Sequence, residues 1–418
     1  MISLRHREQT GKLIAGYLLL FCANGCFFTW SIFSLAFSQA FPQWTQAQLA
    51  FCSALNLIAS ALSALLVRPL ARRVPIPRLC RLGGVIMLAG WISLYTLQWH
   101  SNLLVFYAGY CLTGYATGHF YLLTGQVLNT WFASHSGTVS GGMQLVTGFG
   151  ALVFGALEQA AIAALDVFRL CLFLGVGFFL LSWVCAHWYQ LPAEAAAQEK
   201  TSAGLSAVKA EMGHVGFWML FAWLSLLAAG GLLAVNNAAN IFSVYRAPAA
   251  AGMLVALCSG VACQAVGVVI DRFSLRAAML MVSLMTVLAA GVLVTGHLGN
   301  SGAAVLTGTL LCGGAYGGTC GVKMAGIVKR YGTSRLTAFF GVFNLNIVVA
   351  SAMGPYAAGR LLMAGEGYFL PFVWIGVQAC VSLLTVGLGW NYLKEAGTAP
   401  RHKTHLPGRP CVGHSRCG

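Results

Sequence analysis

Long apolar runs separated by short polar stretches make up nearly the whole chain, up to about residue 393. A helix needs about 20 apolar residues to cross the hydrocarbon core of a bilayer. Inside a bilayer every backbone group needs a partner within the protein, which a helix supplies. The pattern therefore predicts an all-α membrane protein with twelve transmembrane helices. The predicted spans are 13–37, 47–67, 81–97, 103–130, 137–161, 167–189, 213–239, 250–270, 277–297, 301–328, 336–362 and 368–393.

One polar connection is much longer than the others and divides these spans into two sets of six. The segment 191–211 carries three Glu, two Lys and runs of Ala. We therefore expect an N-terminal six-helix bundle over 1–190, a cytoplasmic linker over 191–211 and a C-terminal six-helix bundle over 212–393. A basic cytoplasmic tail follows over 394–418.

The composition supports a membrane location and argues against a soluble or nucleic-acid-binding protein. Hydrophobic residues make up 58% and charged residues 8% of the chain, against about 25% charged residues in soluble proteins. The net charge of +15 does not indicate nucleic-acid binding, because the basic residues gather at the two ends and at every second connection. This asymmetry places both termini in the cytoplasm and the protein in the cytoplasmic (inner) membrane. Of the 24 basic residues, the exceptions are Arg169, Arg246, Lys323 and Arg360.

The fourteen cysteines lie mostly in apolar runs, where they act as small hydrophobic residues and form no disulfide framework. Cys411, His414 and Cys417 form a candidate metal motif in the tail, against the simpler interpretation of a solvated tail. We predict no metal and no cofactor. We find no nucleotide P-loop, no H-E-x-x-H motif and no triad, so the chain is not expected to be an enzyme. The acidic residues Glu158, Asp166 and Glu366 are expected at loop edges, away from any shared cavity.

Two features carry a resemblance to known transporters. Residues 114–118 (GYATG) of the fourth span are echoed by residues 314–318 (GAYGG) of the tenth span. Paired six-helix bundles of this kind are the architecture of the major facilitator superfamily. Residues 25–33 (GCFFTWSIF) resemble the G-x-x-Y-x-W-S-x-F signature of the oxalate/formate antiporter and monocarboxylate transporter families, with Phe28 in place of tyrosine. The resemblance implies a secondary transporter that works by alternating access.

A second motif, in the connection after the eighth span, is similar to the superfamily's G-x-x-x-D-R loop motif. It consists of Gly267, Asp271, Arg272 and Arg276. The resemblance implies a conformational latch, in which the carboxylate caps a neighbouring helix and stabilises one access state. The first loop copy departs from the motif, because Arg68 and Arg72 stand where glycine and aspartate are usual.

The usual carboxylate clamp of these families is also missing. Family members commonly carry a substrate-binding arginine four residues before the motif glycine, and Cys263 occupies that position here. The lysine of the eleventh helix in oxalate transporters has no counterpart, since 336–359 contains no charge. The chain therefore needs another cation if its cargo is an anion, and oxalate itself is not expected.

A polar stripe in the fourth span supplies the first candidates. At about 100° per residue, Tyr115, His119, Gln126 and Asn129 fall within an arc of about 80°. His119 lies roughly 16 Å from the inner end of the span, near the midplane. Two interpretations are open: His119 donates to substrate or carries a proton, or it is a satisfied histidine between helices.

Lys323 is the second candidate, about 8 Å inside the inner end of the tenth span. It either extends to the cytoplasmic headgroups or faces the central cavity, where it replaces the missing cation. Further candidates for substrate contact are the amides and hydroxyls of Asn24, Asn344 and Tyr316.

These observations predict a transporter of a small organic anion, with a short monocarboxylate moved together with a proton as the leading case. The partners are then a small-molecule substrate and the lipid bilayer. A drug or amphipath exporter is the alternative, weakened because no carboxylate lies at the centre of a predicted span. A transporter-like sensor without flux is the third, suggested by the altered first loop motif.

Overall fold

The computed structural model describes residues 2–71, 73–192, 195, 204–246, 252–364 and 367–395. In this part of the chain the regular elements are all helical, and they group into twelve membrane-length segments, as the apolar runs predict. The tail with Cys411, His414 and Cys417 lies outside the described residues, and so do Arg72 and Glu366.

The N-terminal set contains six segments. The first is interrupted and consists of α1 (Ile2–Leu19), the π-helix η1 (Leu20–Asn24), the 3₁₀-helix η2 (Cys26–Thr29) and α2 (Trp30–Ala40). The other five are single helices, and two of them are followed by a short 3₁₀ turn. They are α3 (Gln46–Ala71), α4 (Ile76–Thr96) with η3 (Leu97–Trp99), α5 (Leu103–Trp131) with η4 (Ala133–His135), α6 (Ser136–Leu165) and α7 (Val167–Ala186).

The C-terminal set repeats this plan after a short helix, α9 (Gly204–Met212), in the predicted linker. Its members are α10 (Val215–Asn236) with α11 (Ala238–Val244), α12 (Gly252–Arg272), α13 (Leu275–Leu298), and α14 (Gly302–Tyr331) with η6 (Thr333–Arg335). The eleventh segment is broken into α15 (Leu336–Phe343), α16 (Asn346–Ser351), the π-helix η7 (Ala352–Tyr356) and α17 (Ala357–Ala364). The last segment is α18 (Phe369–Glu395).

Local sequence signals account for where several helices begin. Asn102, Asp166, Ser274 and Ser301 each accept a backbone N–H two or three residues ahead with the side chain. Such N-caps satisfy amide groups that the first turn of a helix leaves unpaired. The short polar connections therefore fix the starts of α5, α7, α13 and α14.

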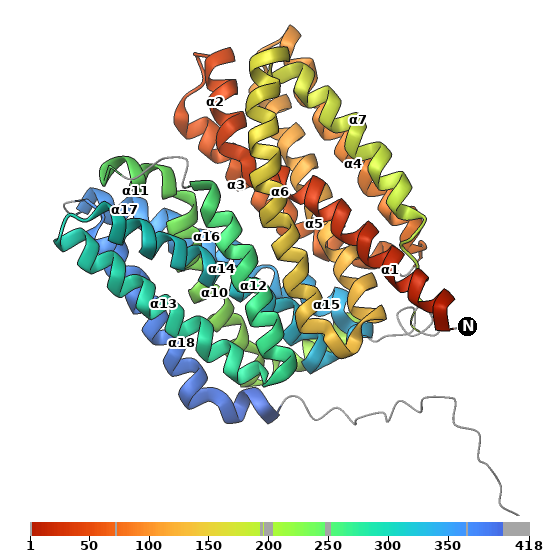
Figure 1. The fold of residues 1–418 in the computed structure, drawn as a ribbon, viewed down its shortest axis with the longest axis vertical. Coiled ribbons are helices and arrows are strands. Elements are labelled where there is room, and N and C mark those ends of the chain that lie inside the picture. Colours follow the sequence, from red (N-terminus) through yellow and green to blue (C-terminus); the bar gives the residue numbers. More distant parts are fainter. Residues whose placement is uncertain are drawn as a thin grey trace, which may run out of the picture.

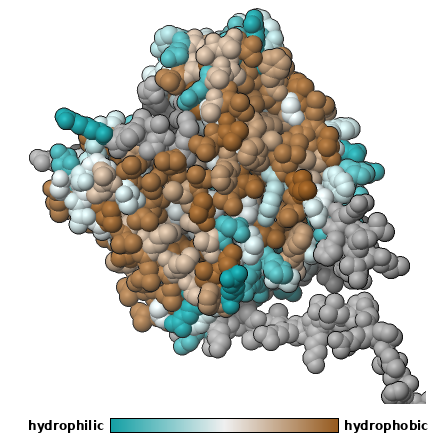
Figure 2. All heavy atoms as spheres, viewed as in Figure 1, coloured by the Kyte–Doolittle hydropathy of each residue, from teal (hydrophilic) through white to brown (hydrophobic). Residues whose placement is uncertain are grey.

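Eight of the described helical stretches are long and apolar enough to cross a membrane by length and composition. Large apolar side chains on the outer surface agree with this, since Leu35 is 62% exposed and Leu388 is 80% exposed. Figure 2 shows the apolar surface spread over the body of the molecule, with hydrophilic residues concentrated towards its ends. Lipid tails are the solvent that suits such a surface.

The two bundles meet along α6 and α12, and also where α14 contacts α6 and α15 contacts α3. We call the end of the molecule where α12 ends and α15 begins the basic end, since it carries Arg78, Arg272 and Lys329. Figure 1 shows the bundles joined at this end, near α15, and diverging towards the opposite end, which carries α2, α11 and α17.

Candidate functional site

Lys323 of α14 turns into the protein and not towards the membrane surface. Its side chain is 6% exposed, and its Nζ donates to Asn344 Oδ1 at 2.7 Å and to Asn346 Oδ1 at 3.4 Å. The ammonium also lies 5.2 Å from the centre of the Phe340 ring, a cation–π distance. Lys323 therefore faces the interior of the protein and does not extend to the lipid headgroups.

The break in the eleventh segment presents both amides to this lysine. In a continuous helix, positions two residues apart point about 200° apart. Here α15 ends at Phe343 and α16 begins at Asn346, with a 3.1 Å bond from Leu345 N to Val342 O between them. The tighter turn brings Asn344 and Asn346 to the same ammonium. The spacing N-x-N was the available signal, and our sequence reasoning, which assumed a regular helix, missed Asn346.

The NH₂ group of each of these two amides donates a hydrogen bond to a backbone carbonyl of a neighbouring helix. The Asn344 Nδ2 donates to the carbonyl of Ala61 in α3 at 3.5 Å, and the Asn346 Nδ2 donates to the carbonyl of Leu224 in α10 at 3.2 Å. Because both NH₂ groups are used, both amide oxygens face Lys323. Asn344 thereby connects the lysine to a helix of the other bundle.

A small pocket opens beside this group. It is lined by Ala228, Tyr316, Thr319, Cys320, Lys323, Asn346 and Ile347. Its volume is about 10 Å³, roughly the space that one water molecule needs. In this arrangement the pocket therefore holds little more than a water-sized group.

The charge of Lys323 has no acidic partner in the described part of the chain. The salt bridges found there are Lys12–Glu8, Arg169–Asp166 and Lys329–Asp271. The two amide oxygens that accept hydrogen bonds from its ammonium group are neutral, so no acidic side chain there balances a positive charge on Lys323. The pocket thus offers one fixed cation and several neutral polar groups to whatever enters it.

His119 lies elsewhere, inside the N-terminal bundle. It is fully buried, and its Nε2 donates to the carbonyl of Leu79 in α4 at 2.8 Å. The Tyr115 ring lies 6.0 Å from the His119 ring and is partly exposed. His119 therefore contacts α4, and neither residue lines the pocket with Lys323. The helical arc showed that they share a face, but not which neighbour that face meets.

The remaining sequence candidates are divided between the two bundles. Tyr316 and Asn344 join Lys323 at or beside the pocket. Gln126 is buried near the basic end of α5, and its carbonyl accepts the Thr130 hydroxyl. Asn24 is buried in η1, and its Oδ1 has no hydrogen-bond partner within the described residues. The structure therefore brings together Lys323, Asn344 and Tyr316, while Gln126 and Asn24 are not among the residues that line the pocket.

We expect substitution of His119 to affect stability more than transport. His119→Ala removes a buried ring and its hydrogen bond to Leu79, which costs about 2 kcal/mol of unfolding free energy. His119→Gln keeps a donor and should retain the pH dependence of uptake. Thermal unfolding and uptake at several pH values check this. A glutamine variant that folds but no longer responds to pH would return His119 to a proton-carrying role.

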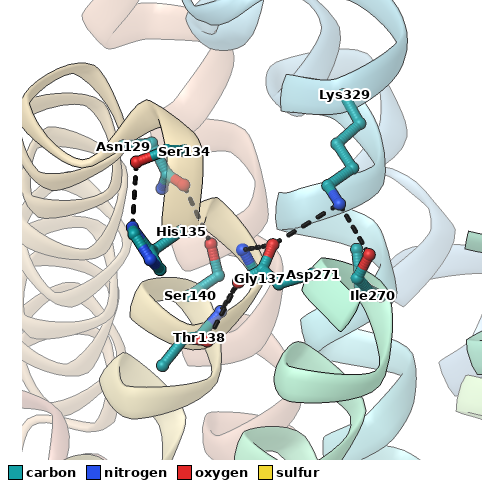
Figure 3. A network of polar contacts seen from close by, with 9 residues as sticks. All are labelled: Asn129, Ser134, His135, Gly137, Thr138, Ser140, Ile270, Asp271 and Lys329. Carbon is teal, nitrogen blue, oxygen red and sulfur yellow. Dashed lines mark hydrogen bonds and ion pairs between the residues drawn. The ribbon is translucent and has the colours of Figure 1, made fainter. Parts of the chain in front are cut away.

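Asp271 bridges the two bundles at the basic end (Figure 3). Its Oδ1 accepts the backbone N–H of Gly137 at 3.0 Å, and its Oδ2 accepts the N–H and hydroxyl of Thr138 at 2.7 and 2.9 Å. Gly137 and Thr138 are in the first turn of α6, where unpaired amides and the helix dipole favour a carboxylate. Lys329 approaches the same carboxylate at 3.4 Å and donates to the Ile270 carbonyl at 2.6 Å.

The other two residues of the expected latch take no part in this bridge. Arg272 is exposed, and Arg276 lies over the Trp390 ring at 5.4 Å. A glycine pair completes the contact instead: a Cβ on Gly267 would lie 2.1 Å from the Gly137 carbonyl oxygen. The helices approach this closely because neither residue has a side chain.

The position of Glu158 corrects the sequence analysis. We expected it at a loop edge, but α6 continues seven residues beyond it to Leu165, and its side chain is only 1% exposed. The predicted span ended at 161, four residues before the observed end of α6. A carboxyl group therefore lies inside a membrane segment after all.

Comparison with known proteins agrees with this architecture. A family model described as Major Facilitator Superfamily matches residues 19–355. The proton:xylose symporter XylE, bound to 6-bromo-6-deoxy-D-glucose, superposes with a TM-score of 0.71 at 13% identity, covering 94% of this chain and 96% of that chain. FucP in its outward conformation gives a TM-score of 0.62 at 14% identity, covering 90% and 99%. At these identities the solved structures show the fold alone.

A variant of the E. coli fucose:proton symporter FucP matches in the same way, with a TM-score of 0.59 at 14% identity, covering 90% of this chain and 99% of that chain. No curated protein sequence gives a significant match.

Proposed function

We propose that this chain, which belongs to the major facilitator superfamily, carries a small organic anion as its cargo. Members of this superfamily are transporters and not enzymes. A short monocarboxylate moved together with a proton is the case we favour. The protein then resides in the cytoplasmic membrane with both termini in the cytoplasm, which the concentration of arginine and lysine at the basic end supports.

One observation carries the choice of an anion. Lys323 is buried beside a pocket, its hydrogen bonds go to two amide oxygens, and it has no acidic partner among the described residues. An unpaired buried charge is costly, and an entering anion lowers that cost by pairing with it. A cation entering the same pocket would be repelled. The narrow pocket has to widen less for a cargo of a few heavy atoms than for a drug-sized one.

Alternating access fits this position. The pocket lies where α14, α10 and the broken eleventh segment meet, and Asn344 connects it to α3 of the other bundle. A carrier in which two bundles rock around a site between them changes such cross-bundle contacts in each cycle. We therefore place Lys323, Tyr316, Asn344 and Asn346 at the cargo site, and Asp271 at the closure of the basic end.

A thermal-shift screen of the purified full-length protein tests the cargo class. The probes are formate, acetate, lactate, pyruvate, neutral amino acids and cationic dyes. A ligand at about 100 times its Kd stabilises the folded state by about 2.7 kcal/mol. We expect the carboxylates to raise the melting temperature and the dyes to have no effect. Stabilisation by the dyes alone would contradict the proposal and favour the drug exporter.

Uptake of the stabilising carboxylate into proteoliposomes then separates a carrier from a sensor. Accumulation against a gradient is expected of a secondary transporter. Specific binding without any uptake or exchange would show instead that the chain senses its ligand.

A further inference from the structure

The Glu158 carboxyl group is buried in the N-terminal bundle without an ordinary hydrogen bond. Neither of its oxygens has a partner among the described residues. The next residue along α6 towards the basic end, Leu157, is 57% exposed on the lipid-facing surface. At the depth of Glu158, one side of α6 therefore faces lipid and the other side faces the rest of the protein.

The groups that face Glu158 come from three other elements, and none of them is basic. Cys26 and Thr29 of η2 interact with the carboxyl, as do Tyr110 of α5 and Cys171 of α7. Thr29 uses its hydroxyl to donate to the Cys26 carbonyl at 2.8 Å. The Tyr110 hydroxyl has no hydrogen-bond partner in the described part of the chain. More distant titratable neighbours of this group are Cys22, Cys52 and Asp166.

A carboxylate is poorly suited to these surroundings, but a carboxylic acid is well suited to them. An ionised group buried with no cation beside it, and with only hydroxyl and thiol groups nearby, is strongly disfavoured, and it is usually neutralised by a proton. A metal ion would need several oxygen ligands, and no metal-binding group of His, Cys, Asp or Glu is found in the described residues. A proton requires no cavity and fits the packing as it stands.

The same carboxyl faces the interruption in the first segment. There the chain passes from the π-helix η1 through Gly25 into the 3₁₀-helix η2. Departures of this kind from α-helical geometry within a helix often mark hinges. Gly25 packs directly on α6, where a Cβ would lie 2.8 Å from the Gly150 Cα. If Glu158 ionises, the nearby Thr29 and Tyr110 hydroxyls become its donors, and Thr29 must release the Cys26 carbonyl to donate.

We propose that Glu158 is the proton-binding residue of this transporter and that its ionisation rearranges η1 and η2. One proton from solution adds to one carboxylate oxygen and removes one negative charge, and the reverse step returns it to solution. The coupling to cargo rests on the function proposed above: one proton carried with one monovalent anion moves no net charge. The protonation itself does not depend on that function.

Infrared spectroscopy of the full-length protein in lipid membranes tests the protonation without any cargo. We expect a carboxylic-acid C=O band at neutral pH that decreases as the pH is raised. Glu158→Gln should remove this band, and Glu158→Asp should shift it. The matched control is Asp166→Asn, because the Asp166 side chain is 46% exposed at the start of α7; it should leave the band unchanged.

Each other outcome overturns the proposal. Absence of the band in the wild-type protein shows that no buried carboxyl is protonated, whatever the variants do. A band that persists in Glu158→Gln belongs to another residue. A Glu158 band that never titrates shows a fixed structural acid.

The coupling is tested with whichever of formate, acetate, lactate or pyruvate binds. Glu158→Gln, which mimics the protonated acid, should keep exchange of the carboxylate. It should lose accumulation driven by a pH gradient by about tenfold or more, within the range of typical coupling between sites. Undiminished accumulation in this variant would refute the coupling. If no carboxylate binds, the cargo proposal fails and the infrared result still decides whether Glu158 holds a proton.

Discussion

Replacing Lys323 by methionine is expected to remove carboxylate binding while the protein remains folded. Methionine has a similar length but no charge, so the pocket keeps its shape and loses its only described cation. Removing one member of a buried charge pair costs about 3–5 kcal/mol, which corresponds to a loss of affinity of roughly 100-fold or more. The thermal shift produced by the best carboxylate should therefore disappear.

The stability of the ligand-free protein separates lost binding from misfolding. Asn344 and Asn346 lose a donor, at about 1 kcal/mol each. A buried unpaired charge is removed at the same time, which offsets that loss. The melting temperature without ligand should thus change little. Lys209→Met serves as the matched control, because it removes one exposed positive charge from α9, away from the pocket.

Lys323→Arg is expected to keep part of the affinity with altered selectivity, because a planar guanidinium and a compact ammonium present their donors differently. A Lys323→Met protein that binds and transports a carboxylate normally would contradict the anion proposal. The cationic-drug exporter would then be the leading alternative.

Gly267→Ala is expected to open the basic end. The new Cβ would lie 2.1 Å from the Gly137 carbonyl oxygen, and this backbone atom cannot move without shifting α6. Overpacking of this kind costs about 1–3 kcal/mol. An equilibrium between access states then changes by roughly 5- to 150-fold, because about 1.4 kcal/mol is tenfold. The affected contact includes the hydrogen bonds of Asp271, so transport should slow strongly.

Hydrogen–deuterium exchange reports this change directly. The backbone amides of Gly137 and Thr138 are protected by Asp271 in the closed arrangement, and they should exchange faster in Gly267→Ala. Gly291→Ala is the control, since a Cβ at this helical position meets no atom within 4 Å. Unchanged protection of the start of α6 would show that the close approach of α6 and α12 does not hold this end shut.

The fold was predictable because spanning a bilayer leaves few choices. Each apolar run had to become a helix. Eleven of the twelve segments begin and end within five residues of the predicted bounds, whereas the first begins at Ile2, eleven residues before the predicted start. The interior position of Lys323 was one of two interpretations that the sequence left open. A lysine near a helix end reaches either water or the protein interior, and only the neighbouring helices decide which.

The sequence analysis failed where the answer depended on packing partners or on irregular backbone. The helical arc of His119 and Tyr115 indicated a polar face, but His119 donates to α4 and neither residue lines the pocket with Lys323. Asn346 became a partner of Lys323 through a break that no periodicity revealed. Glu158 was placed at a loop edge because a charged residue near the end of an apolar run is usually solvated, whereas packing against the other helices buries it here.

Asn344 has a consequence for compounds that would block this carrier. Its oxygen accepts from Lys323 while its NH₂ group donates to Ala61 of the other bundle. Under the function proposed above, the cargo draws the lysine away from this amide and so alters a contact between the bundles. By thermodynamic reciprocity, cargo affinity and the balance of access states then influence each other equally. An inhibitor that occupies the pocket but leaves the Lys323–Asn344 bond intact should arrest the carrier in this arrangement. Such an inhibitor should stay bound and should not be transported.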